Sequence, residues 1–433
     1  MLGIALAAST ALSTPALAQR DYGGAATQQM QQPQARGQQK EEPKKQQKGG
    51  ATVTIGDRKV AISPEFAAIY KEMIDAATAK DMATVTAKAP AAHAAAKTPE
   101  EHYLASQMQL KAGMETKADA EIAAGLQGML DSGQMPQDQL AAAYNGLGKT
   151  RYNLKQYPEA AAAFEKQLAL QPNDSEAMTL LAASRERGGQ SGDAVALLQK
   201  AIAQQSANGA KAPEDLYKRA LSAAYKAKMP AAVQISRDWV AAYPSPANWS
   251  DAIRIYRNLN QVDDATTLDL LRLARAAGAL KGEADYDRYA YAALTKGYPG
   301  ETKTILDEGI KAGVVTPTKD PFKEMIAQAK AKSAGEEATL ESAAKSALAA
   351  STAKSALSTG DLLYGYGQYA KAAELYRAAL KKTGADANLV NLHLGMALAR
   401  SGDKAGATAA LNAVTGPRAE VAKYWLAYLS TQA

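Results

Sequence analysis

Cysteine is absent from this chain of 433 residues, and histidine occurs only three times. The lack of cysteine excludes disulfides, a thiol nucleophile, Cys-ligated zinc and Cys-bound iron–sulfur clusters. The histidines are His93, His102 and His393, and none lies four residues from another. No H-E-x-x-H motif is present either, so the sequence predicts no metal site. Aromatic residues make up only 6% of the chain, and the mean hydropathy is negative, which argues against a polytopic membrane protein.

Motifs that bind phosphates or carry catalysis are also missing. Gly148-Lys149-Thr150 matches the end of a phosphate-binding loop, but Ala143 stands where the first glycine is needed. Residues 365–370 match G-x-G-x-x-G/A, but no strand precedes them, so a turn between helices is the better interpretation. The sequence therefore predicts no catalytic residue, no cofactor-binding residue and no cofactor, and we expect the protein not to be an enzyme.

The N-terminal region is typical of an export signal. Residues 2–17 are apolar, and Ala16 and Ala18 fit an A-x-A cleavage site. No cysteine follows the apolar run, which excludes a lipoprotein anchor there. The sequence predicts a cleaved signal peptide over residues 1–18, a periplasmic or secreted location, and no integral membrane span after cleavage.

Residues 19–50 form a Gln/Lys-rich segment. Residues 19–48 hold ten glutamines in thirty positions and almost no large apolar side chains. Such a segment buries too little surface to offset its ordering entropy, so the sequence predicts disorder. Residues 19–48 carry a charge of +3 and the rest of the chain another +3, which sum to the total of +6. Since the body lacks a strongly basic footprint, we expect no nucleic-acid partner.

The body from Ser63 onward is predicted to be helical. Ser63-Pro64-Glu65 and Thr98-Pro99-Glu100 have the hydroxyl, proline and carboxylate that start helices. Proline and glycine then interrupt the chain at short intervals. Only residues 52–62 show alternating β-branched side chains, and we expect one short extended piece there.

Two segments of the body align at a spacing of 34 residues. Leu147-Gly148 matches Leu181-Ala182, and Ala160, Phe164 and Gln167 match Ala194, Leu198 and Ala201. A similar order recurs from Thr359-Gly360 to Tyr376, and again from Leu394-Gly395 to Leu411. This pattern resembles the tetratricopeptide repeat, in which two helices and two short turns fill each unit. In this interpretation the small residues let helices approach, and Phe164 and Tyr376 fill the gaps.

The resemblance implies an all-α fold, a right-handed solenoid of helix hairpins. It is clearest over residues 141–206 and 353–415. We divide the chain into a signal peptide (1–18), a disordered segment (19–50), an N-terminal helical-repeat block (51–330), an Ala/Lys/Glu-rich helix or hinge (331–352) and a C-terminal tetratricopeptide block with a capping helix (353–433).

The resemblance also implies a groove, since the first helix of each tetratricopeptide unit lines a concave surface. Tyr, Asn and Arg on rigid helices suit peptide recognition, because aromatic anchors lose little entropy and polar groups bond to backbone. The protein-binding groove candidates are Asn145, Lys149, Tyr152, Asn153, Arg187, Asp361, Tyr364 and Arg400.

We therefore expect a non-enzymatic scaffold or adaptor of the bacterial cell envelope that binds protein segments along a superhelical groove. The alternative is a cell-wall or glycan-related accessory module or enzyme with a site in the irregular region 213–330. Self-association into a homo-oligomer stays open as well, with Trp249 and Trp425 expected as exposed aromatics. The partner is predicted to be a protein or peptide, and the sequence does not identify it.

Overall fold

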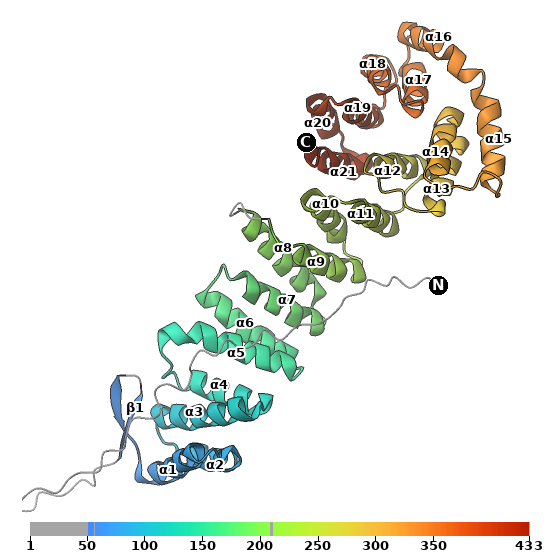
Figure 1. Ribbon diagram of the computed structural model, residues 1–433. Coiled ribbons are helices and arrows are strands. Elements are labelled where there is room, and N and C mark those ends of the chain that lie inside the picture. The colour runs from blue at the N-terminus through green and yellow to red at the C-terminus, as the bar shows by residue number, and fades with distance from the viewer. Residues whose placement is uncertain (1–50, 56, 208–210, 433) are drawn as a thin grey trace, which may run out of the picture. The chain divides into compact units, whose positions relative to one another are not determined.

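The computed structural model describes residues 51–55, 57–207 and 211–432. The predicted signal peptide (1–18) and the Gln/Lys-rich segment (19–50) lie outside the described residues. The chain divides into two compact units after Gln190, unit 1 up to that residue and unit 2 from Ser191 onward. Each unit is a stack of antiparallel helices (Figure 1), so the prediction of an all-α helix-hairpin solenoid is confirmed.

Unit 1 begins with a small hairpin and continues as helices. Its strands pair antiparallel with Val53 opposite Val60, so residues 52–62 form two strands and not one extended piece. The elements are β1 (Thr52–Ile55), β2 (Arg58–Ala61), α1 (Pro64–Thr78), α2 (Met82–Ala95), α3 (Pro99–Thr116), α4 (Asp119–Asp131), the 3₁₀ turn η1 (Gln137–Gln139), α5 (Leu140–Asn153), α6 (Tyr157–Leu170) and α7 (Ser175–Arg187).

Unit 2 holds the remaining helices. They are α8 (Ser191–Ala207), α9 (Glu214–Lys226), α10 (Ala231–Ala242), α11 (Pro246–Leu259), α12 (Asp264–Ala276), α13 (Glu283–Thr295), α14 (Pro299–Lys311), α15 (Phe322–Ser333), α16 (Glu336–Ala349), α17 (Ala353–Gly365), α18 (Tyr369–Ala379), α19 (Ala387–Ser401), α20 (Lys404–Asn412), η2 (Gly416–Arg418) and α21 (Ala419–Ser430). The Ala/Lys/Glu-rich region (331–352) thus contains the last residues of α15 and the whole of α16, which are separate helices. No helix among the described residues of either unit is long and apolar enough to cross a membrane.

The helix starts follow from local chemistry. Thr98 accepts a hydrogen bond from the Glu101 backbone, and the Glu101 carboxylate accepts one from the Thr98 backbone in return, a complete capping box. Ser245 and Asp174 cap α11 and α7 in the same way through one side-chain oxygen. Because most turns are short, consecutive helices within each unit pack side by side.

Small residues let the paired helices approach, as the repeat pattern predicts. A Cβ placed on Gly148 of α5 would lie 2.6 Å from the Phe164 ring of α6, and one on Gly360 of α17 would lie 2.6 Å from the Tyr376 ring of α18. Both distances are below van der Waals contact. The large aromatic side chain therefore occupies the space that the missing Cβ leaves free.

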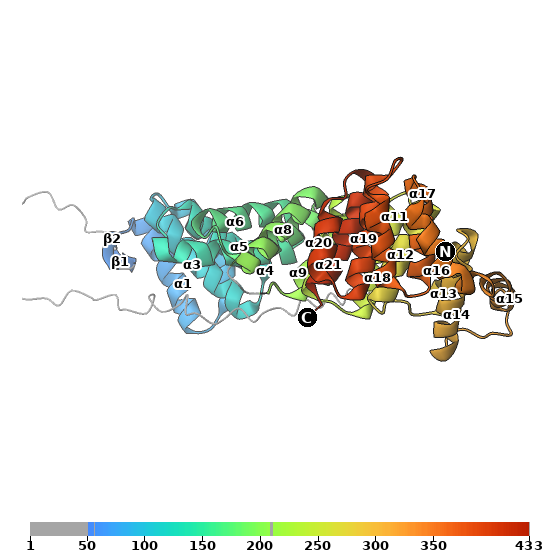
Figure 2. The same ribbon diagram turned by 90° about the horizontal axis from the view of Figure 1, so that it is seen from above.

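In unit 2 the C-terminal helices pack against helices from the middle of the same unit. Helix α21 packs against α10 and α12, and α17 packs against α14; α19, α20 and α21 lie side by side (Figure 2). At this closure the Tyr424 hydroxyl lies 2.6 Å from Ser236 Oγ and donates to the Val233 carbonyl. The predicted capping helix of the C-terminal block thus covers helices nearly two hundred residues earlier in the chain.

The expectation of two exposed tryptophans is wrong. Trp249 is 2% exposed and Trp425 is fully buried. Trp249 packs edge-on against Tyr428, and Trp425 packs edge-on against the same ring. Both indoles are used in the closure of unit 2, where burial of an aromatic side chain contributes about 2–3 kcal/mol.

Candidate protein-binding surface and a buried polar cluster

Helices α5 and α7 of unit 1 form one face that brings together five of the predicted groove residues. We call Asn145, Lys149, Tyr152, Asn153 and Arg187 the α5–α7 face. Lys149 Nζ lies 2.9 Å from Glu176 Oε1 on α7, and the Lys149 side chain keeps 27% of its surface exposed. Asn153 and Arg187 are exposed, and Tyr152 is half-buried. These side chains are therefore open to a partner.

Two of these side chains lie close together. The interaction with the Tyr152 hydroxyl raises the pKa of the Arg187 guanidinium. The Tyr152 ring also packs edge-on against Tyr157 at 5.4 Å between centroids. An aromatic ring that is held by its neighbour loses little entropy on binding, and a guanidinium beside it adds a charged contact, which suits a peptide.

Asn145 is placed differently from the other four. Its Nδ2 donates to Gln167 Oε1 at 3.1 Å, and Gln167 in turn donates to Asp174 at 2.8 Å. Asp174 is the N-cap of α7. Asn145 therefore also fixes α5 against α6 and the start of α7, and its amide is only partly available to a partner.

The three predicted residues in unit 2 lie in another setting. Asp361 and Tyr364 on α17 are 4% and 3% exposed, and Arg400 on α19 is half-buried and donates to the Tyr369 hydroxyl at 3.3 Å. The side of α17 and α19 that carries Asp361 is covered by α12 and α14 of the same unit. Helices of unit 2 thus cover the surface of α17 that the sequence predicts to be part of a binding groove.

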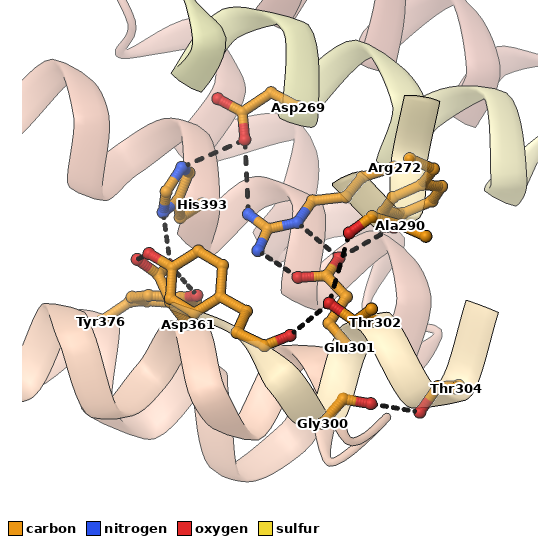
Figure 3. A network of polar contacts seen from close by, with 12 residues as sticks. Asp269, Arg272, Ala290, Gly300, Glu301, Thr302, Thr304, Asp361, Tyr376 and His393 are labelled. Carbon is orange, nitrogen blue, oxygen red and sulfur yellow. Dashed lines mark hydrogen bonds and ion pairs between the residues drawn. The ribbon is translucent and has the colours of Figure 1, made fainter. Parts of the chain in front are cut away.

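A cluster of charged side chains lies at this covered surface. We call Asp269, Arg272, Glu301, Asp361 and His393 the buried polar cluster (Figure 3). They come from α12, α14, α17 and α19, and none is more than 7% exposed. Arg272 donates to both carboxylate oxygens of Glu301 at 2.9 and 2.7 Å, a bidentate pair. The Arg272 guanidinium also lies 4.8 Å from the centre of the Tyr364 ring, so it is stacked as well as paired.

His393 joins two carboxylates of the cluster. Its Nε2 lies 3.3 Å from Asp269 Oδ1, and its Nδ1 lies 2.7 Å from Asp361 Oδ1. Burial alone would lower the pKa of His393, but the charges of Asp361 and Asp269 outweigh it and raise the pKa to about 10. The imidazole is therefore a cation at neutral pH. The His393 charge in turn overcomes the burial of Asp361 and holds the pKa of that carboxyl below its usual value.

Tyrosine hydroxyls also donate to the carboxylates of Asp361 and Glu301. Tyr376 and Tyr298 donate to the two oxygens of Asp361 at 2.7 and 2.9 Å, and Tyr289 donates to Glu301 at 2.8 Å. Burial, the first cause, raises the pKa of Tyr289 and of Tyr376, and the neighbouring carboxylates raise it further. These hydroxyls therefore keep their protons at ordinary pH and act as hydrogen-bond donors to the carboxylates.

Two glycines allow α14 and α17 to cross at this place. A Cβ on Gly365 would lie 2.7 Å from Glu301 Cβ and 3.3 Å from the α14 backbone, and a Cβ on Gly300 would overlap the Tyr366 ring. The close crossing puts Glu301 within reach of Arg272 and the tyrosines. The cluster is thus a structural clasp between the middle of unit 2 and its C-terminal helices, and the described histidines and carboxylates form no metal-binding arrangement.

Sequence reasoning missed Asp269, Arg272, Glu301 and His393. One signal was present: Asp269 and Arg272 stand three residues apart inside the apolar run Leu268 to Leu273. Charged residues at that spacing share a helix face. Because leucines surround them in the sequence, this part of the helix is expected to be buried. Glu301 on α14 and His393 on α19 have no comparable signal in the sequence around them.

One comparison with known proteins agrees with this architecture. The sequence model of the tetratricopeptide repeat family matches residues 145–213 and 357–421. The chain therefore carries tetratricopeptide repeats in both units, and the repeats predicted at 141–206 and 353–415 are confirmed. Repeats of this class generally mediate protein–protein interaction. No curated protein matches the chain.

Two solved structures are similar at low identity. A tetratricopeptide repeat protein from Parabacteroides merdae is 11% identical over 78% of this chain and 100% of that chain, with a TM-score of 0.26. A structure of Naa15/Naa10 bound to HypK-THB is 15% identical over 80% of this chain, with a TM-score of 0.27. This chain covers 63% of that second chain.

Proposed function

We propose that the protein is a non-enzymatic scaffold of the bacterial cell envelope that binds segments of other proteins on the α5–α7 face. The observation that carries the proposal is the contrast between the two repeat regions. In unit 1 the predicted groove residues are solvent-accessible, with Tyr152 and Arg187 close to each other. In unit 2 Asp361 and Tyr364 are covered by helices of the chain itself. Binding is therefore assigned to unit 1, and Asp361, Tyr364 and Arg400 are assigned to internal packing.

The location in the envelope rests on the sequence alone. The apolar residues 2–17 and the Ala16-x-Ala18 site support export to the periplasm or the medium. A partner would then be an exported protein or an exposed segment of a membrane protein.

The alternative, a glycan-related enzyme with a site in residues 213–330, has less support. The carboxylates that converge from this region are Asp269 and Glu301, and both are buried and bonded within the protein. A general acid or base must reach its substrate, and these two groups do not.

The test uses matched surface variants of the exported protein as bait. Arg187→Ala and Tyr152→Ala each remove one of the two neighbouring side chains, and Glu159→Ala changes an exposed carboxylate on the neighbouring helix α6. Proteins captured from an envelope extract are compared by quantitative mass spectrometry. The proposal expects a partner that the native chain and the Glu159→Ala variant retain and that both other variants lose. Equal recovery with all variants would refute the assignment to the α5–α7 face.

A further inference from the structure

An open cavity of about 670 Å³ lies in unit 1 between the turn that joins α1 to α2 and the C-terminal part of α3. We call it the α1–α3 cavity. It shares no residue with the α5–α7 face or with the residues that match the repeat family. Its volume is within the range of roughly 300–1,000 Å³ that is typical of small-ligand sites. Its polar lining consists of Thr78, Lys80, Asp81, Lys111, Glu115 and Thr116.

Three charged side chains of the cavity have no ion-pair partner in the part of the chain that the structure describes. Lys80 and Glu115 are exposed, and Lys111 is half-buried. Lys111 and Glu115 stand four residues apart on α3, a spacing that allows an ion pair on a helix. Lys71 and Asp75 of α1 have the same order and spacing, and they are paired at 2.7 Å. The pair on α3 is open, so its ammonium and its carboxylate are each available to a ligand.

Two threonine hydroxyls add hydrogen-bond acceptors to the cavity. Thr78 Oγ1 donates to the Ile74 carbonyl at 2.8 Å, and Thr116 Oγ1 donates to the Ala112 carbonyl at 2.7 Å. Each hydroxyl proton is therefore used within its own helix. The oxygen of each threonine is left as an acceptor for a donor group of a ligand.

The formal charges that line the cavity sum to zero, because Lys80 and Lys111 are balanced by Asp81 and Glu115. A ligand with one sign of charge is attracted by one pair and repelled by the other, whereas a ligand with both signs is attracted by both. The two carboxylates are not equally available. Asp81 accepts hydrogen bonds from the backbone and the hydroxyl of Thr84 at 3.1 and 2.6 Å, so Glu115 is the carboxylate that is left for a ligand cation.

The spacing of Lys111 and Glu115 sets the length of such a ligand. Four residues of an α-helix rise about 6 Å. An extended dipeptide spans at most about 7 Å and ends in an ammonium and a carboxylate, whereas a free amino acid carries both groups on the same carbon. Ala77 and Met82 supply an apolar part of the lining, which suits the small side chains of a dipeptide.

We propose that the α1–α3 cavity binds a zwitterionic dipeptide, with the ligand carboxylate at Lys111 and Lys80 and the ligand ammonium at Glu115. The peptide N–H of the ligand donates to a threonine oxygen of the cavity. This small-molecule site is additional to the protein-binding face proposed above and does not depend on it.

The test is methyl NMR of the exported protein with isotope-labelled methionine methyl groups, titrated with alanylalanine. The Met82 signal, assigned with Met82→Leu, reports on the cavity, and the signal of Met178, which is buried on α7, reports on a distant part of unit 1. We expect a saturable shift of Met82 and none of Met178. Lys111→Gln and Glu115→Gln should each weaken binding about tenfold, because each removes a charge-assisted contact. Lys166→Gln changes an exposed lysine on α6 and should leave binding unchanged.

Two blocked ligands test the two charges separately. Acetylation of the ligand ammonium and amidation of its carboxylate should each weaken binding about as much as the variants do. No saturable shift of Met82, equal affinity for the free and the blocked dipeptides, or an equal loss with Lys166→Gln and Lys111→Gln overturns the site. Tighter binding of inorganic phosphate than of alanylalanine overturns the choice of a dipolar ligand. Tyr152→Ala should leave the Met82 shift unchanged, so a failure of the α5–α7 face leaves this result readable.

Discussion

His393→Gln should destabilise unit 2 at neutral pH and have a much smaller effect at alkaline pH. The reason is the positive charge of protonated His393, which lies between the carboxylates of Asp269 and Asp361. Its pKa rises from 6.5 in the unfolded chain to about 10 in the folded one, so the folded state binds the proton more tightly. The stabilisation is fully present below pH 6.5 and is lost as the pH rises toward 10.

The size of the effect follows from the two pKa values. Their difference, from 6.5 to about 10, corresponds to roughly 5 kcal/mol at most, and about half of it should disappear between about pH 7 and 9. Glutamine retains hydrogen bonding to one carboxylate but supplies no charge. The cost of leaving buried carboxylates without their cation is about 3–5 kcal/mol, which agrees with that range.

The chain provides its own probe for this experiment. Its three tryptophans are Trp239, Trp249 and Trp425, and all three belong to unit 2 and are buried. Tryptophan fluorescence during urea unfolding therefore follows unit 2 and not unit 1. The native chain and the His393→Gln variant are compared at about pH 7 and at about pH 9. Effects of lysine and tyrosine titration occur in both proteins and therefore cancel in the difference between them.

We predict a gap in unfolding free energy that narrows by about 2–3 kcal/mol between about pH 7 and 9. A gap that stays constant over this range would show that the imidazole is uncharged in the folded state. The account of the clasp as a charged cluster would then be wrong.

Three further changes test the packing. Gly365→Ala should cost about 1–3 kcal/mol in the tryptophan-monitored transition, because its Cβ would collide with α14, whereas Gly335→Ala points into open space and should cost less. Gly148→Ala should lower the stability of unit 1 by a similar amount, because its Cβ would lie 2.6 Å from the Phe164 ring; circular dichroism should register this loss while tryptophan fluorescence does not. Tyr424→Phe removes the hydroxyl that bonds to α10 and should cost about 1–2 kcal/mol by the same fluorescence assay.

The repeats were predictable because their signals are local. A small residue at Gly148 and a large one at Phe164 recur at the spacing of one helix pair, and contact between them needs only a short turn. The same logic identified Gly360 and Tyr376. The capping box at Thr98 was also recognisable, since all its atoms lie within four residues.

The closure of unit 2 was not predictable in this way. Ser236 and Tyr424 meet across 188 positions of the chain, and no spacing rule relates them. The burial of Asp361 and Tyr364 follows from the same closure, because the residues that cover them come from α12 and α14. Register in the repeat identified these side chains as inward-facing, but the sequence could not show that the chain would fill that space itself.

Site-specific photocrosslinking in cells tests the central claim most directly. A photoreactive residue replaces Tyr152 on the α5–α7 face or, as the control, Ala162, which is exposed on α6. The account predicts that a distinct protein is crosslinked from Tyr152 and not from Ala162, and that Arg187→Ala reduces its yield. Capture of this chain alone, or of the same proteins from both positions, would contradict the claim that the α5–α7 face binds a protein partner.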